Sequence, residues 1–144
     1  MKPPRASTQA SNGIPATLFK GSKAKWLPLY HRVLARLSSV SGMEFLNGAR
    51  EVSILSTAAT SKTKGRMGLI RVTESGLEVG LRLGKGVTAA MARNERLIPS
   101  RKIPLWVTHR VLITSASQID EEFLSWLKVA RHQAGSTRPR STSR

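Results

Sequence analysis

Residues 66–84, RMGLIRVTESGLEVGLRLG, decide the fold, because apolar and polar residues alternate there on both sides of one turn signal. The dipeptide Ser75-Gly76 is typical of a two-residue turn between antiparallel strands. With these two residues at the turn, the alternation keeps one apolar face in register across both strands. We therefore expect a β-hairpin that pairs Glu74 with Leu77, Val72 with Val79, and Ile70 with Leu81.

The two faces of this predicted hairpin differ in chemistry. The apolar face consists of Ile70, Val72, Leu77, Val79, Leu81 and Leu83. The other face carries Arg71, Thr73, Glu78 and Arg82, together with Met67 and Leu69. Successive side chains of a strand point to opposite sides of a sheet. We therefore expect the apolar face to pack against helices and the charged face to stay partly open.

The flanking sequence supplies two more strands and two helices. Apolar residues spaced three and four apart predict a helix over residues 24–40. Runs of β-branched and apolar residues predict strands over 51–56 and 105–114. A last helix is signalled by Ser117 as its N-cap, by acidic residues in its first turn and by Gly135 at its end.

Together these elements predict an α+β fold with an N-terminal helix, a small antiparallel sheet of about four strands, and a C-terminal helix packed on one face. Residues 84–104 fit either a short helix or a loop. The two ends are polar and rich in Ser, Thr and Pro, without a helix or strand period. We expect a disordered basic arm over 1–21, a single domain over 22–134 and a disordered basic tail over 135–144.

The strongest signal of the composition is its charge. The 144 residues include 24 Lys and Arg against 8 Asp and Glu, a formal net charge of +16. The arm and the tail hold six of the bases and none of the acids, so residues 22–134 keep 18 bases against 8 acids, a net of +10. Such a surface attracts phosphate polymers through the release of counterions. The alternative interpretation is that the charge only keeps the protein soluble.

Three arginines would share the open face of the sheet if their strands are neighbours: Arg71, Arg82 and Arg110. Lys85 follows the hairpin in a glycine-rich run that is similar to a phosphate-binding loop, but Gly86 stands where such a loop needs Ser or Thr. We take these four residues as the candidates for binding an anion or a nucleic acid. A second candidate footprint consists of Lys85, Arg93, Arg96 and Arg101.

Motifs for catalysis are missing. The chain has no cysteine, and its three histidines show no ligand spacing, so the sequence predicts no metal site and no cofactor. Asp120, the only aspartate, has a capping role in the last helix. His109 lies on the apolar face of its predicted strand. It is interpreted either as a core histidine with a hydrogen-bond partner or as a pocket residue.

Five pieces of the sequence occur in the order found in a known bacterial family: KGSKAKWLPLYHRVLARL, VSIL, GLEVGLRL, ERL and THRVLITSASQIDEEFLSWLKVA. On these pieces, which extend over about residues 20–131, the chain resembles domain of unknown function 5655. Members commonly show Ala-Tyr where this chain has Ala130-Arg131, and often an aromatic residue where it has Gly68-Leu69-Ile70. The resemblance implies an antiparallel sheet packed by helices from both ends of the chain, and it implies no established activity.

The sequence therefore favours a non-enzymatic binding or accessory module, with an anionic partner such as nucleic acid bound without sequence preference. One alternative is a protein-interaction module whose charge is incidental. Another is an enzyme with an unrecognised site near His109 and Arg110. No stretch approaches the ~18 apolar residues of a membrane helix, and no secretory signal opens the chain. We accordingly expect a cytoplasmic protein with no membrane partner, and the sequence does not predict its oligomeric state.

Overall fold

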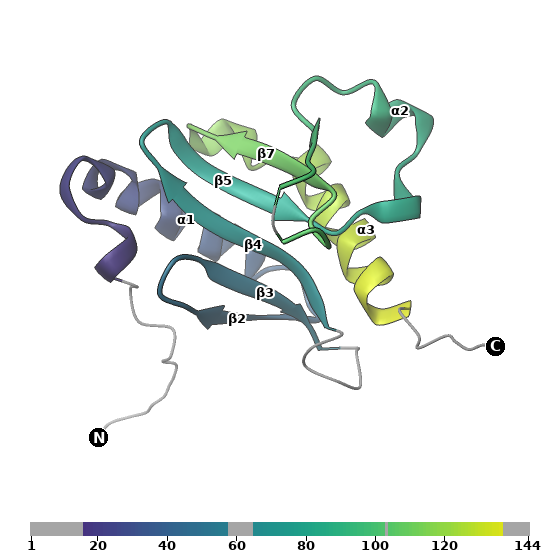
Figure 1. Ribbon diagram of the computed structural model, residues 1–144, viewed down its shortest axis with the longest axis horizontal. Helices are drawn as coiled ribbons and strands as arrows, with labels where there is room; N and C mark the ends of the chain where they lie inside the picture. The colour runs from purple at the N-terminus through teal and green to yellow at the C-terminus, as the bar shows by residue number, and fades with distance from the viewer. Residues whose placement is uncertain (1–15, 58–64, 103, 137–144) are drawn as a thin grey trace.

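The computed structural model describes residues 16–57, 65–102 and 104–136, which build one antiparallel sheet with helices on one side (Figure 1). The strands follow the order β2-β3-β4-β5-β7-β6. Strands β2 to β5 therefore form a meander, and β7 lies between β5 and β6. They are β2 (Met43–Asn47), β3 (Val52–Ser56), β4 (Arg66–Thr73), β5 (Gly76–Leu81), β6 (Ile98–Pro99) and β7 (His109–Ile113). The α+β class and the placement of the first and last helices are confirmed.

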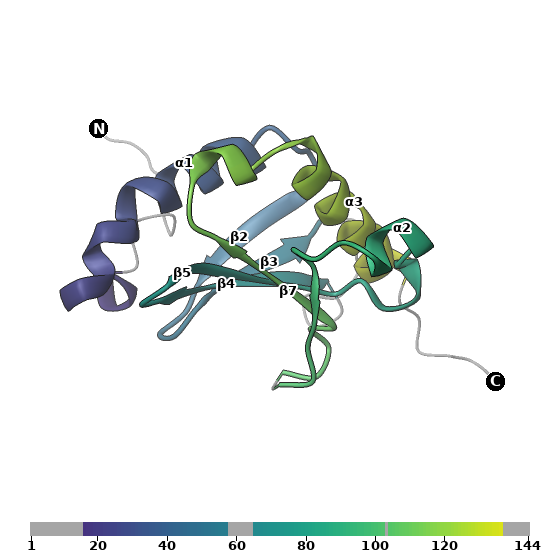
Figure 2. The same cartoon turned by 90° about the horizontal axis from the view of Figure 1, so that it is seen from above.

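Two longer helices lie on the same face of the sheet, as the second view shows (Figure 2). They are α1 (Leu27–Leu37), which continues from the 3-10 helix η3 (Gly21–Trp26), and α3 (Glu121–Ser136). The smaller helical pieces are η2 (Ala16–Leu18), η4 (Gly84–Gly86), α2 (Ala89–Ala92) and η5 (Ala116–Gln118). No helix in these described ranges is long and apolar enough to cross a membrane.

The expectation of about four strands is wrong, because the sheet has six. The two additional strands lie at its two edges. Strand β2 pairs with β3 along five residues but mixes Glu44 with apolar residues, so its alternation is weak. Strand β6 is only two residues long and contains Pro99. Proline has no N–H to donate and is confined to sheet edges, so this segment gives no strand signal.

The hairpin is present, but its predicted register is wrong by two residues. Val72 pairs with Leu77 and Ile70 with Val79, so Glu74 and Ser75 form the turn instead of Ser75 and Gly76. Thr73 selects this turn, since its Oγ1 accepts hydrogen bonds of 3.1 Å from the N–H groups of both Ser75 and Gly76. A shift of two residues leaves each side chain on its predicted face. The assignment of an apolar and a charged face is therefore unaffected.

One residue changes face because of a β-bulge between β3 and β4. Ile54 pairs with Gly68 and Leu55 with Arg66, which leaves Met67 as the extra residue. Met67 was expected on the charged face with Arg71. It is instead fully buried in the core under the helices, because the extra residue interrupts the alternation of the strand.

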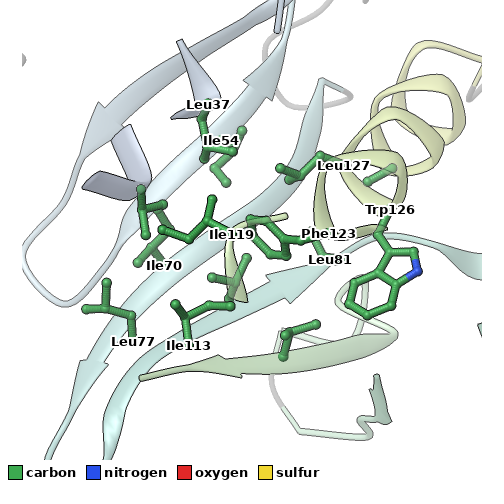
Figure 3. Close-up of a cluster of buried hydrophobic side chains, with 14 of the residues drawn as sticks. Leu37, Ile54, Ile70, Leu77, Leu81, Ile113, Ile119, Phe123, Trp126 and Leu127 are labelled. Atoms are coloured by element: carbon green, nitrogen blue, oxygen red, sulfur yellow. The ribbon is translucent and has the colours of Figure 1, made fainter. Parts of the chain in front are cut away.

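The core fills the space between the sheet and the two helices (Figure 3). Helix α1 contributes Tyr30, Val33 and Leu37. The sheet contributes Val52, Ile54, Ile70, Val72, Leu77, Val79, Leu81, Val111 and Ile113. Phe123 and Trp126 come from α3, and their rings lie 6.5 Å apart edge to face. Full burial of such side chains contributes roughly 1.5–3 kcal/mol each.

The ends of the helices differ from those predicted by the sequence. Helix α1 ends at Leu37 rather than near residue 40, and Gly42, with a φ of +87°, precedes β2. The N-cap of α3 is Asp120, whose Oδ1 accepts the N–H of Phe123 at 2.9 Å, and not Ser117. Ser115 and Gln118 form a capping box one turn earlier, around η5. Helix α3 extends to Ser136, one residue past Gly135, its predicted end.

The face of the sheet away from the helices is partly covered by the segment that leads from β6 to β7 (Figure 2). Val107 packs there against Leu69 and over Gly80. A Cβ atom at Gly80 would lie 2.9 Å from Cγ1 of Val107, so only glycine fits under this segment. This segment therefore covers one part of the charged face and leaves the rest of that face open.

Candidate anion-binding surface

Four charged side chains form a row across the uncovered face of the sheet. Arg71 donates from Nε to Glu51 over 2.9 Å, and Arg110 donates from Nη1 to Glu78 over 3.1 Å. The register places Arg71 directly opposite Glu78, and Arg110 opposite Gly80. Opposite charges thus alternate from Glu51, the residue before β3, across β4, β5 and β7. We call Glu51, Arg71, Glu78 and Arg110 the charge row.

The charge row changes what two of the predicted anion-binding residues offer. The structure places Arg71 and Arg110 on the same face, as expected, but each has a carboxylate partner. The Arg110 side chain is only 7% exposed, so its guanidinium is part of the interior. An anion would have to displace Glu51 from Nε of Arg71, or Glu78 from Nη1 of Arg110, to bind at those nitrogens. The row itself is therefore close to neutral.

Arg82 lies next to the charge row and has a different environment. Its guanidinium carbon is 5.3 Å from the ring centroid of Trp106, within the range of a cation–π contact. Burial lowers the pKa of Arg82, and the nearby positive charge of Arg66 lowers this pKa further. Within the described residues neither arginine has an ion pair with a carboxylate, and Nε of Arg82 is buried without a hydrogen-bond partner. We call Arg66, Arg82 and Trp106 the arginine–tryptophan corner.

A cavity of about 250 Å³ opens at the other end of this face, where β6 meets β7. Its walls are Glu78, Ile98, Pro99, Ser100, Arg101, Lys102, Arg110 and Leu112. Arg110 donates from Nε to Oγ of Ser100 over 2.7 Å, so the buried guanidinium joins the strand to the wall of the cavity. We call this the Arg110 cavity. Three of its walls are cationic side chains and one is a carboxylate.

Lys85 and His109, the other two predicted residues, lie outside this arrangement. Lys85 is exposed in η4, which packs against α3: a Cβ atom at Gly86 would lie 2.6 Å from Val129. His109 pairs with Leu81 and so faces the helices, as its predicted strand face implies. Burial lowers the pKa of His109, which favours the neutral ring. The walls of the Arg110 cavity do not include it.

Nδ1 of His109 lies 2.9 Å from Oγ1 of Thr108. That hydroxyl also accepts hydrogen bonds of 3.0 Å from the N–H groups of Leu83 and Gly84. Thr108 thus fixes the chain where β5 ends, and His109 adds one contact to this local network. In the described part of the chain no three His, Asp or Glu side chains gather as metal ligands would.

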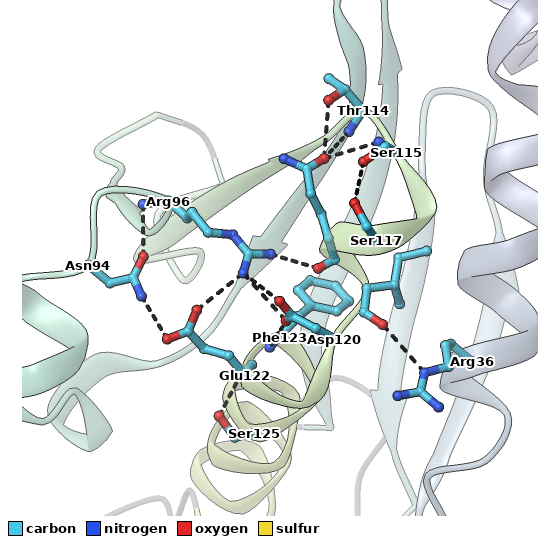
Figure 4. A network of polar contacts seen from close by, with 12 residues as sticks. Arg36, Asn94, Arg96, Thr114, Ser115, Ser117, Asp120, Glu122, Phe123 and Ser125 are labelled. Carbon is cyan, nitrogen blue, oxygen red and sulfur yellow. Dashed lines mark hydrogen bonds and ion pairs between the residues drawn. The ribbon is translucent and has the colours of Figure 1, made fainter.

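The second candidate footprint is divided in the structure, because both terminal nitrogens of Arg96 already have partners (Figure 4). Its Nη1 contacts Asp120 and Glu122, both at 3.1 Å, and its Nη2 donates to the carbonyl of Gln118 over 2.6 Å. The guanidinium carbon also lies 5.2 Å from the ring centroid of Trp126. Arg96 therefore fastens the loop before β6 to the start of α3.

The same contacts with Arg96 also change the pKa of the Asp120 carboxyl. Desolvation would raise the pKa of its carboxyl, but the Phe123 N–H and the Arg96 guanidinium together hold this pKa below its usual range. Since Asp120 also caps α3, the carboxylate stabilises the helix in its ionised form. Arg93 and Arg101, the other arginines of this footprint, are exposed.

Two further cavities lie on the helix side. One of about 610 Å³ lies between α1 and the edge strand β2, with Tyr30, Leu34, Met43 and Phe45 among its walls. The other, of about 330 Å³, lies between α1 and α3. Its walls include Arg36, Lys128 and Arg131, and Arg131 donates to the carbonyl oxygen of Ser41.

Sequence reasoning missed several residues of the uncovered face. Ser100 and Lys102 gave no signal, because they lie in a segment without any period. Arg66 lies at the start of the stretch that decides the fold, and its proximity to Arg82 follows from pairing across β4 and β5. Trp106 is on the same face of its predicted strand as Arg110, so an aromatic ring among basic residues was visible in the sequence.

The fold and the site define a basic α+β domain with a six-stranded antiparallel sheet, covered by helices on one face and carrying charged residues on the other. The family model described as "Domain of unknown function (DUF5655)" matches residues 16–133. The chain belongs to this family, and the predicted resemblance is confirmed. No curated protein and no solved structure showed a significant match.

Proposed function

We propose that this domain is a binding module for a polyanion such as a nucleic acid, without sequence preference, and that the arginine–tryptophan corner is its contact surface. The observation that supports this is the position of Arg82 over the Trp106 indole, within reach of the positive charge of Arg66. Two like charges repel each other, so the arrangement is unfavourable until an anion binds between or across them. A phosphate backbone supplies that charge.

The charge of the whole chain supports the same proposal. The 8 acidic residues are far too few to neutralise 24 basic ones. Five of the acids are already held by four arginines: Arg36, Arg71, Arg96 and Arg110. The remaining basic residues therefore attract counterions, and a polyanion releases those counterions when it binds.

The indole gives the corner a second means of contact. Bases of a single strand stack on aromatic rings with little regard to sequence, because every base has a π-face. Arg82 already lies over the Trp106 ring, and guanidinium groups pair with phosphate through two parallel hydrogen bonds. We expect single-stranded nucleic acid to bind with a base near Trp106 and its phosphates near Arg66 and Arg82.

The test removes two charges at the corner and compares the result with two charges removed elsewhere. The site variant is Arg66→Gln/Arg82→Gln, and the matched control is Arg32→Gln/Lys128→Gln, both exposed residues of the helices. Binding of a labelled 20-nucleotide single strand is followed by fluorescence anisotropy against salt. For single strands the log–log slope is about −0.7 per phosphate contact, so the site variant, which removes two contacts, should lose about 1.4 slope units and the control should not.

Equal effects of the two double variants would refute the corner as the contact surface, since they would show that only net charge matters. Because Arg82 is half-buried, Arg66→Gln alone is measured as well, and it should lower the affinity without changing the thermal melt. Absence of any binding at low salt would refute the proposed function itself.

A second candidate function is a protein-interaction module that accepts an extended peptide beside β2. Strand β2 is an edge strand of five residues without proline, next to the cavity of about 610 Å³. Leu46 of this strand is 54% exposed. Free strand edges recruit peptides through backbone hydrogen bonds. Leu46→Pro should abolish binding of such a peptide while leaving nucleic-acid binding unchanged.

A further inference from the structure

We propose that the Arg110 cavity is a binding site for a small oxyanion, a carboxylate or a phosphate monoester, that carries a short branched apolar group. This site is separate from the arginine–tryptophan corner. It requires no polyanion, so it stands or falls independently of the function proposed above.

The first support is a donor without an acceptor. Arg110 uses Nε for Ser100 and Nη1 for Glu78, and both partners line the cavity. The remaining nitrogen, Nη2, is buried and has no hydrogen-bond partner among the described residues. A guanidinium cannot lose its charge in a protein, so this donor stays unsatisfied until an acceptor reaches it. An oxyanion oxygen is the acceptor that guanidinium groups bind best.

The second support is the sign of the charge at the mouth of the cavity. Arg101 and Lys102 are exposed there, and in the described part of the chain neither forms an ion pair. Glu78, the only acid in the walls, is bound to Arg110. The Lys102 N–H donates to Oγ of Ser100 over 3.3 Å, which holds the turn that carries both cations. The cavity therefore attracts an anion.

The third support is the apolar part of the cavity lining. Ile98 is 55% exposed and Leu112 is 40% exposed, which is unusual for large aliphatic side chains of a sheet. Together with Pro99 they form the apolar part of the lining of the same cavity. A branched alkyl group would cover these side chains and remove their surface from water.

The size of the cavity limits the ligand. Its volume of about 250 Å³ corresponds to the space of roughly eight water molecules. That is enough for an oxyanion head with a chain of five or six carbons, and too little for a nucleotide. Ser100, Arg101 and Lys102 form part of the cavity wall, so a ligand in the cavity would contact this turn. We therefore expect the backbone signals of that turn to change on binding.

The test uses four probes in ¹⁵N–¹H correlation spectra of the full chain. Two of them have the complete chemistry, 4-methylpentanoate and isopentyl phosphate; inorganic phosphate has only the head, and isopentanol has only the tail. We expect at least one complete probe to cause saturable shifts at Ser100, Lys102 and Leu112, and at the Nε–H signal of Arg110. The dissociation constant should be on the order of 1 mM.

The two complete probes distinguish the two sources of the oxyanion. Binding of one of them alone supports the site and names the head group; binding of both supports the shared chemistry. If the two partial probes together reproduce the shifts at the same concentrations, the proposal is overturned, because linking head and tail then adds nothing. It is also overturned if no probe shifts these signals, since Nη2 would then be satisfied by water alone.

Variants locate the site without disturbing the interior. Arg101→Ala/Lys102→Ala removes the exposed cations and should weaken binding about tenfold. The matched control, Lys85→Ala/Arg93→Ala, removes two exposed cations elsewhere and should leave affinity within twofold. Ile98→Ser should weaken the complete probes but not inorganic phosphate. Equal weakening by the site and control pairs would overturn the proposal, and this result does not depend on any variant of the buried Arg110.

Discussion

Replacing Arg96 by alanine should destabilise the domain more than any other change of a single charged surface residue of the same loop. The side chain is 27% exposed and contacts four other residues at once. Its nitrogens bind the carboxylates of Asp120 and Glu122 and the carbonyl of Gln118, and its guanidinium lies over Trp126. Alanine at this position makes neither the ion pairs, nor the hydrogen bond, nor the contact with the Trp126 ring.

The magnitude follows from the separate contacts. The hydrogen bond to the Gln118 carbonyl has a charged donor and contributes about 1.5–3 kcal/mol. The cation–π contact with Trp126 contributes about 0.5–1 kcal/mol. The two ion pairs have half-exposed carboxylates and contribute about 0–1 kcal/mol. We therefore expect the free energy of unfolding to fall by about 3 kcal/mol in Arg96→Ala.

Urea denaturation followed by tryptophan fluorescence measures this loss. With an m-value of about 2 kcal/mol/M, the midpoint should fall by about 1.5 M urea. Arg93→Ala is the matched control, because Arg93 is an exposed arginine of the same loop, and its effect should stay below about 0.5 kcal/mol. Arg96→Lys should recover only a small part of the loss, since lysine keeps the charge but lacks the planar fork.

The pH dependence gives an independent check. The pKa of Asp120 is lowered in the folded protein, partly by Arg96, so its contribution to stability is present above the unfolded-state pKa and is lost as pH falls through the folded value. Because Asp120 is the only aspartate, selective labelling gives a single titrating signal. Its pKa should rise in Arg96→Ala. Equal stability of Arg96→Ala and Arg93→Ala, with an unchanged Asp120 pKa, would refute the reasoning.

Three further outcomes are expected. Burial raises the pKa of Tyr30, the only tyrosine, to about 12, so its absorbance should titrate near that value and stability should decline as pH rises from about 10. Titration near 10 would contradict its burial. Gly76→Ala should cost about 2 kcal/mol or more in urea denaturation, since φ is +148° and the new Cβ would lie 2.7 Å from the Ile113 oxygen; an unchanged midpoint would argue against this turn. Nuclear Overhauser contacts should join Val72 to Leu77, whereas contacts from Val72 to Val79 would restore the register first predicted.

The hairpin shows how far the sequence determines the fold. Alternation assigns residues to faces, but it is unchanged by a shift of two residues, so it cannot choose between the turn at Ser75-Gly76 and the turn at Glu74-Ser75. That choice depends on the Thr73 hydroxyl, which binds two backbone N–H groups. The bulge at Met67 was hidden for a related reason, because it depends on how β4 pairs with β3.

The charged face shows the same limit for the site. The sequence correctly places Arg71 and Arg110 on one side of the sheet. It does not show that Glu51 lies beside Arg71, because the ion pair joins different strands. Glu78 and Arg110 are even further apart in sequence, and their contact requires β5 and β7 to be neighbours. Charges can thus be counted from the sequence, but their partners cannot.

The arrangement of the core also determines when the domain can fold during synthesis. Strands β2 to β5 form a meander of neighbouring segments, so they can pair as soon as they leave the ribosome. Their apolar face, however, is closed by Phe123, Trp126 and Leu127 of α3. Until α3 has been synthesised, the apolar face of the nascent sheet stays exposed to solvent. A pause in translation before residue 120 would therefore prolong the lifetime of an aggregation-prone intermediate. The chain would depend on chaperones most at that stage.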